Sequence, residues 1–104
     1  MEMVKSMLKE ELAHSLEVLE HYRRALSGLP SGALVKKRIH GGEYWYRVFR
    51  EGSKVRTEYV GKVNGEEAAA ALRDQEKRKR YRELEREVRQ KIRYLEKVIH
   101  ARAV

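Results

Sequence analysis

The chain has 104 residues and no cysteine, which is enough for one modest core and excludes both disulfides and thiolate metal sites. Charged residues make up 38% of the sequence and the formal net charge is +8, so the surface attracts phosphate-bearing partners. No apolar run reaches the roughly 18 residues of a membrane span and the first residues lack a signal-peptide core, so we expect a cytoplasmic protein with no membrane partner. The scarcity of Asn and Gln beside abundant Glu, Lys and Arg resembles the composition of heat-adapted proteins.

Residues 1–28 have the apolar spacing of an amphipathic helix. One stripe recurs every three or four positions, at Val4, Leu8, Leu12, Leu16, Leu19, Tyr22 and Leu26. Gly28 is expected to end this helix as a left-handed cap residue. The Pro-Ser-Gly run at residues 30–32 then predicts a turn.

Residues 33–62 are predicted to form a three-stranded antiparallel meander. Its strands cover about residues 34–40, 43–50 and 54–60. The pairs Gly41-Gly42 and Gly52-Ser53 separate these strands, and two-residue glycine loops suit the hairpin turns that need positive φ.

Residues 65–103 are predicted to form one long helix, with Asn64 as its cap and Glu67 completing a capping box. Neither Gly nor Pro occurs after Gly65. The later half keeps an apolar seam at Tyr81, Leu84, Val88, Ile92, Leu95 and Ile99. We expect the first helix to cover this seam in a coiled-coil-like hairpin, and a second copy of the chain to add cover as a homodimer. The fold is therefore α+β, in a single domain of residues 1–104.

Strand alternation divides the meander into two faces. With two-residue loops, Arg38 pairs with Trp45, and Arg47 pairs with Glu58. One face then holds Val35, Ile39, Tyr44, Tyr46, Val48, Val55 and Tyr59, with Lys37 and Thr57 at its fringe. This face is apolar enough to be the inner one, and we expect the small side chains of residues 68–71 to pack against its tyrosines.

The opposite face predicts a nucleic-acid-binding surface. It holds Lys36, Arg38, His40, Trp45, Arg47, Phe49, Arg56 and Glu58. Lysine and arginine neutralise phosphates, arginine reads guanine edges in the major groove, and exposed aromatic rings stack on bases. Two alternatives stay open. Trp45 and Phe49 can be covered by the first helix, and a one-residue slip in either hairpin would exchange the faces and move the surface to Tyr44, Tyr46 and Tyr59.

Four segments carry a resemblance to known proteins: Leu29 to Ile39 (LPSGALVKKRI), Tyr44-Trp45-Tyr46, Arg50-Glu51-Gly52 and Tyr59 to Lys62. They resemble a small family of uncharacterised prokaryotic proteins, in which this pattern leads into a three-stranded sheet and a charged helix. The order of three strands and a helix is also similar to the arm-type DNA-binding domain of tyrosine integrases. That topological likeness implies DNA binding through Lys36, Arg38, Trp45, Arg47 and Arg56, although the long flanking helices depart from the integrase pattern.

A second basic element lies at residues 77–82 of the last helix. Its candidate contacts are Lys77, Arg78 and Arg80, which can follow phosphates beside a bound duplex. The alternative is a solvated helix with ion pairs three and four residues apart.

The sequence offers no catalytic constellation. His14 and His21 are too far apart along a helix to share a metal ion, and no glycine-rich phosphate loop opens a helix. We therefore expect no enzyme activity, no metal and no cofactor. The leading hypothesis is nucleic-acid binding, with DNA preferred over RNA and double-stranded DNA the first candidate. The alternative is a protein-interaction or self-assembly module built on the long helices.

Overall fold

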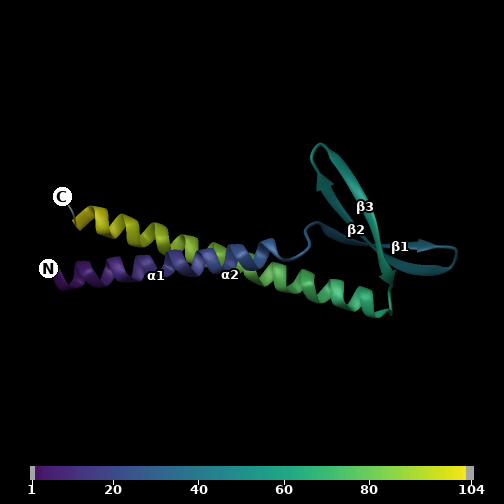
Figure 1. Ribbon diagram of the computed structural model, residues 1–104, viewed down its shortest axis with the longest axis horizontal. Coiled ribbons are helices and arrows are strands. Elements are labelled where there is room, and N and C mark those ends of the chain that lie inside the picture. The colour runs from purple at the N-terminus through teal and green to yellow at the C-terminus, as the bar shows by residue number, and fades with distance from the viewer. Residues whose placement is uncertain (1, 103–104) are drawn as a thin grey trace. The chain divides into compact units, whose positions relative to one another are not determined.

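The computed structural model describes residues 2–102 as a helix, three antiparallel strands and a long helix (Figure 1). The elements are α1 (Glu2–Ser27), β1 (Ala33–Ile39), β2 (Gly42–Glu51), β3 (Lys54–Lys62) and α2 (Glu66–Arg102). This is the predicted α+β order, and Met1 and Ala103 of the predicted helices lie outside the described residues. The chain divides into a hairpin unit, residues 2–28 with 79–102, and a sheet unit, residues 29–78.

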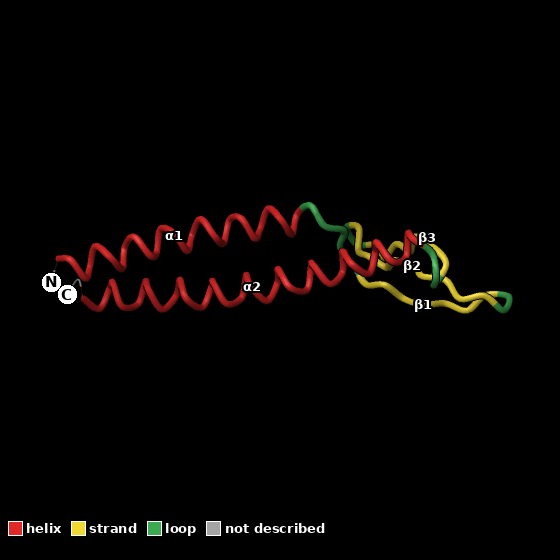
Figure 2. Tube along the Cα trace, turned by 90° about the horizontal axis from the view of Figure 1, so that it is seen from below, coloured by secondary structure: helices red, strands yellow, loops and turns green. Residues whose placement is uncertain are grey.

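The hairpin unit consists of α1 and the later part of α2, which lie side by side and run in opposite directions (Figures 1 and 2). Leu19, Val88 and Ile92 form its buried core, and the Tyr22 and Tyr81 ring centroids lie 5.9 Å apart. The seam of α2 is therefore covered by α1, as the sequence predicted. Ser15 of α1 is also buried here, because a small side chain fits where two helix backbones approach closely.

One ion pair joins the two helices of the hairpin unit. The Lys91 ammonium donates a hydrogen bond to the Glu11 carboxylate. That hydrogen bond, together with the lysine charge, holds the pKa of the Glu11 carboxyl below its ordinary value of 4.5. The pair is exposed, so the apolar seam is the main source of stability in this unit.

The sheet unit has strand order β1-β2-β3, and its first turn differs from the prediction. Ile39 pairs with Gly42, so the loop is His40-Gly41, with φ values of 50° and 81°, and not Gly41-Gly42. The register therefore places Lys36 opposite Trp45 and Arg38 opposite Glu43. This differs from the expected pairing by two residues, and an even shift leaves every side chain on its predicted face. His40, predicted on a face, lies in the turn.

The second turn is the predicted one. Glu51 pairs with Lys54, which leaves Gly52-Ser53 as the loop. Gly52 has a φ of 64°, as the first central position of a type II′ turn requires.

Replacing His40 is expected to stabilise the sheet unit. A turn with positive φ at both central positions favours Asn-Gly, and histidine is a poorer residue there. We expect His40→Asn to raise the free energy of unfolding by about 0.5–1 kcal/mol. Denaturant titration followed by the fluorescence of Trp45, the single tryptophan, measures this change.

Ser53→Asn is the matched control, because Ser53 does not have positive φ. Equal gains at the two turns would contradict this explanation.

A bulge in β3 determines which face α2 approaches. Tyr46 pairs with Tyr59 and Trp45 with Gly61, so Val60 is the extra residue. Val60 and Gly61 together oppose Trp45, and Gly61 therefore lies on the same side of the sheet as the indole. A Cβ added to Gly61 would lie 3.3 Å from Glu67 Cβ and 3.6 Å from the Ala68 nitrogen. The first turn of α2 thus adjoins the Trp45 side.

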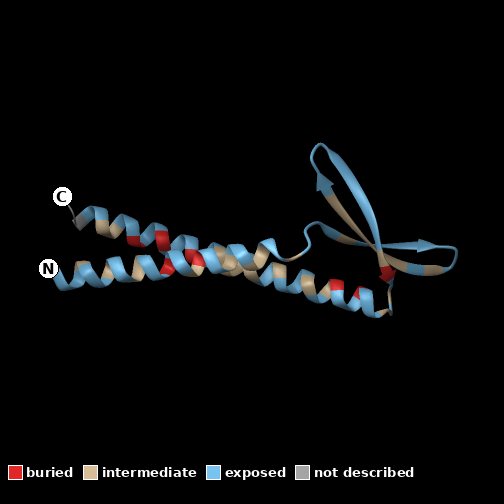
Figure 3. Cartoon of the chain, in the orientation of Figure 1, coloured by how far each residue is buried: buried red, intermediate tan, exposed pale blue. Residues whose placement is uncertain are grey.

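The buried residues of the sheet unit lie at this junction. Ala68, Ala71 and Gly61 are buried, whereas most of the sheet is exposed or half-buried (Figure 3). Small side chains allow the helix backbone to come close to the strand.

At the end of α1 and at the start of α2, the observed helix cap differs from the predicted one. The Gly65 carbonyl accepts a hydrogen bond from the Ala69 amide at 3.1 Å, so Gly65 rather than Asn64 is the N-cap of α2. Gly28 does follow α1, but its φ is not positive. There the Ser27 hydroxyl donates to the Arg24 carbonyl oxygen at 2.8 Å.

Candidate nucleic-acid interface

The register gives the two sheet faces their composition. The tryptophan face holds Leu34, Lys36, Arg38, Glu43, Trp45, Arg47, Phe49, Glu51, Lys54, Arg56, Glu58, Val60 and Gly61. The tyrosine face holds Ala33, Val35, Lys37, Ile39, Tyr44, Tyr46, Val48, Arg50, Val55, Thr57, Tyr59 and Lys62. The predicted division of the aromatic residues is therefore correct.

The predicted covering of these faces is wrong. The alanines of α2 were expected against the tyrosines, but the contact at Gly61 places them on the tryptophan face. Trp45 and Phe49 are half-buried there, and the Arg47 side chain is only 18% exposed. On the tyrosine face, Tyr59 is 54% exposed. The cause is the bulge, which places a glycine beside Trp45 and lets the helix approach.

Most cations of the tryptophan face have carboxylate partners. Lys36 lies 4.0 Å from Glu43, Arg47 lies 4.0 Å from Glu58, and Arg56 lies 3.5 Å from Glu51. All three acids of the sheet are used in these pairs.

The Lys36 ammonium also lies 5.5 Å from the centroid of the Trp45 ring, a cation–π geometry. Arg38 and Lys54 are exposed. Neither has a carboxylate partner among the described residues.

The tyrosine face combines a ring cluster with cations and carries no acid. The Tyr59 ring lies 5.5 Å from that of Tyr46, edge to face, and 6.1 Å from that of Tyr44. The Lys37 ammonium lies 5.0 Å from the Tyr46 ring centroid. Arg50 and Lys62 complete the cations of this face.

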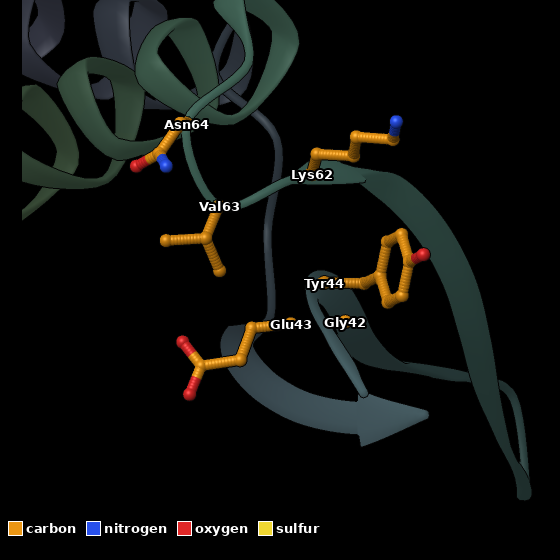
Figure 4. A pocket seen from close by; sticks show the side chains of 6 residues that line it. All are labelled: Gly42, Glu43, Tyr44, Lys62, Val63 and Asn64. Atoms are coloured by element: carbon orange, nitrogen blue, oxygen red, sulfur yellow. The ribbon is translucent and has the colours of Figure 1, made fainter. Parts of the chain in front are cut away.

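Tyr44 and Lys62 also border a shallow pocket at the end of the sheet. The pocket has a volume of about 310 Å³ and is lined by Gly42, Glu43, Tyr44, Lys62, Val63 and Asn64 (Figure 4). The side chains of Tyr44 and Lys62 extend to one side, away from those of Glu43 and Val63 (Figure 4). The Glu43 carboxylate is thus kept away from the Lys62 ammonium.

The predicted basic helix segment is divided between the two units. Lys77 and Arg78 belong to the sheet unit, whereas Arg80 belongs to the hairpin unit. Lys77 is exposed and Arg78 is half-buried. Arg80 pairs with Glu83 at 3.6 Å, three residues along α2, which is the pairing expected of a solvated helix.

Residues 2–102 contain no group of three or more His, Cys, Asp or Glu side chains placed to hold a metal ion. None of their helices is long and apolar enough to cross a membrane.

Along the chain, the fold combines a long helix, a basic and aromatic three-stranded sheet and a second long helix, which defines an α+β protein. A family model, described as a domain of unknown function (DUF6788), matches residues 4–70, which is more than half of the chain. The chain belongs to this family, in agreement with the sequence resemblance to an uncharacterised family. No curated protein and no solved structure matches the chain.

Proposed function

We propose that this protein binds nucleic acid through its three-stranded sheet, with double-stranded DNA as the first ligand to test. One observation carries the proposal. The strands hold eight Lys and Arg residues against three acids, and the ion pairs of the sheet use only three of the eight. The five cations left without a carboxylate partner in the described structure are Lys37, Arg38, Arg50, Lys54 and Lys62.

Free cations favour a polyanionic ligand for a physical reason. A paired lysine or arginine already has its counter-charge, whereas an unpaired one gains a partner when it meets phosphate and releases condensed counterions. Three strands about 4.8 Å apart are roughly 10 Å across. That width is compatible with a major groove of about 12 Å.

On the tryptophan face, the exposed cations without a carboxylate partner, Arg38 and Lys54, support phosphate contacts in such a groove, and the paired cations Lys36 and Arg56 are exposed beside them. We propose that three side chains of the same face, those of Trp45, Arg47 and Phe49, hold these cations in position.

The test measures affinity for a mixed-sequence DNA duplex from low to physiological salt. We expect log K to fall linearly with log salt concentration, and Arg38→Ala to reduce the slope by about 1. Arg38 is preferred to Arg47, because removing a half-buried, paired arginine also changes stability.

Lys9→Ala is the matched control, since it removes the same charge from an exposed position of the hairpin unit. Absence of duplex binding at low salt, or duplex affinity that does not respond to salt, would exclude double-stranded DNA as the ligand.

Self-assembly through the helices is the second candidate. The observation in its favour is that Met3 and Met7, one turn apart on α1, are both strongly exposed. A homodimer is not required to cover the apolar seam of α2, because α1 covers that seam within the chain. Sedimentation at micromolar concentration tests a homodimer, and a monomer would exclude it.

A further inference from the structure

We infer that the tyrosine face binds the unpaired bases of single-stranded nucleic acid. This inference rests on the proposed function and names the form of nucleic acid and the surface that reads it. The surface is centred on Tyr44, Tyr46 and Tyr59, with Lys37, Arg50 and Lys62 around them.

Tyr59 supplies the most exposed ring of this face for stacking. Tyr59 is near both other rings, at 5.5 Å from Tyr46 and 6.1 Å from Tyr44 between ring centroids, and is 54% exposed. The Tyr59 ring does not stack face to face with either neighbour, since the ring planes are inclined at 70° and 51°. An exposed ring that is not stacked on another ring can receive a base. Tyr44 and Tyr46 are half-buried, as Trp45 and Phe49 are, but only Trp45 and Phe49 lie on the face that α2 adjoins.

Charge complementarity selects a polyanion for this face. Lys37 and Lys62 both pair with Tyr44, from the two neighbouring strands, so cations flank that ring on either side. Every acid of the three strands lies on the other face, at Glu43, Glu51 and Glu58. A phosphate backbone crossing the tyrosine face therefore meets three cations and no carboxylate from the strands.

The combination favours unpaired bases over a duplex. Inside a duplex the base faces are stacked, and only base edges reach the grooves, so a tyrosine ring on a sheet cannot stack against them. The exposed aliphatic side chains of Val35, Ile39 and Val55 extend the same face. Sugars and base edges of a splayed strand can pack against them.

Four probes test the inference at one low salt concentration. They are a mixed-sequence single-stranded DNA oligonucleotide, the RNA of the same sequence, the DNA duplex of that sequence, and inorganic polyphosphate, which has charge without bases. We expect the single strands to bind more tightly than the duplex, with the DNA and RNA arms showing which sugar is preferred. Tyr59→Ala should weaken single-strand binding about tenfold or more.

Two variants separate stacking from other roles of Tyr59. Tyr59→Phe keeps the ring and should retain single-strand affinity, and neither Tyr59 variant should change polyphosphate affinity. Lys62→Ala should weaken all four probes, because it removes charge alone. Circular dichroism and thermal melting establish that each variant is folded, which is expected for side chains as exposed as these.

The outcomes distinguish the two proposals. If no probe binds, the proposed function fails and the inference fails with it. If the duplex binds as tightly as the single strands and Tyr59→Ala changes neither, the inference is overturned while nucleic-acid binding survives. If Tyr59→Phe loses as much affinity as Tyr59→Ala, the hydroxyl acts rather than the ring, and stacking is overturned.

Discussion

Gly32→Ala is expected to destabilise the sheet unit by about 2–4 kcal/mol. Gly32 precedes β1 with a φ of 97°, a conformation that residues with a Cβ rarely adopt. A Cβ at this position would lie 2.4 Å from the Val48 carbonyl oxygen and 2.8 Å from Phe49 Cβ. Because the first of these atoms belongs to the backbone of β2, no side-chain rotation relieves the clash. Ala33 must then separate from Val48, its partner in the register.

Denaturant titration followed by Trp45 fluorescence measures this loss, since Trp45 lies in β2. Gly41→Ala is the matched control. Gly41 also has positive φ, 81°, but a Cβ there would meet nothing within 4 Å. Only the conformational cost, about 1 kcal/mol, is expected at that position. Equal losses in the two variants would show that the close approach of Gly32 to β2 does not matter.

Val88→Lys is expected to destabilise the hairpin unit by about 3 kcal/mol or more. Val88 is buried with Leu19 and Ile92. The substitution removes apolar contacts and brings an ammonium group into the seam, where none of the described carboxylates is buried to pair with it. The helical signal in circular dichroism should then be lost at a lower denaturant concentration.

Gln90→Lys is the matched control for Val88→Lys. It adds the same charge to the same helix at an exposed position and should leave the midpoint nearly unchanged. If Val88→Lys kept its stability but changed its sedimentation coefficient, the seam would be an interface between copies instead of the core of a hairpin.

The helices and the two sheet faces were predictable because each depends on a fixed period. Apolar residues three and four apart specify one side of a helix, and α1 covers the seam of α2 in this way. Alternation in a strand has a period of two. For this reason the misplaced first loop changed which residues pair but left Trp45 and Tyr46 on their predicted faces.

The covering of the faces was not predictable from the same pattern. Both faces carry large aromatic residues, and side-chain volume alone favoured packing the alanines of α2 against tyrosines. Instead, the bulge at Val60 places Gly61 opposite Trp45, so α2 approaches the tryptophan face. An extra strand residue of this kind leaves no mark in hydrophobic periodicity. The available signal was Gly61, since a glycine within a strand often marks a bulge or a close backbone approach.

The cations of the tyrosine face were also only partly found. Lys37 was assigned to the fringe of that face, but Arg50 and Lys62 were not assigned to either face. A useful signal lay in the acids, because Glu43 and Glu51 lie eight positions apart in one strand, which is an even spacing. They therefore point to the same side of the sheet, and the register adds Glu58 to that side.

Strand order leaves the outer backbone edges of β1 and β3 open to pairing with another chain. Two features oppose such pairing: the Lys36-Lys37-Arg38 run on β1, whose charges repel an identical strand, and the bulge that distorts β3. A polyanion that neutralises the β1 charges removes the first barrier. Protein with a bound polyanion should therefore self-associate edge to edge more readily than unbound protein. High ionic strength during purification should have the same effect, because salt screens the β1 charges.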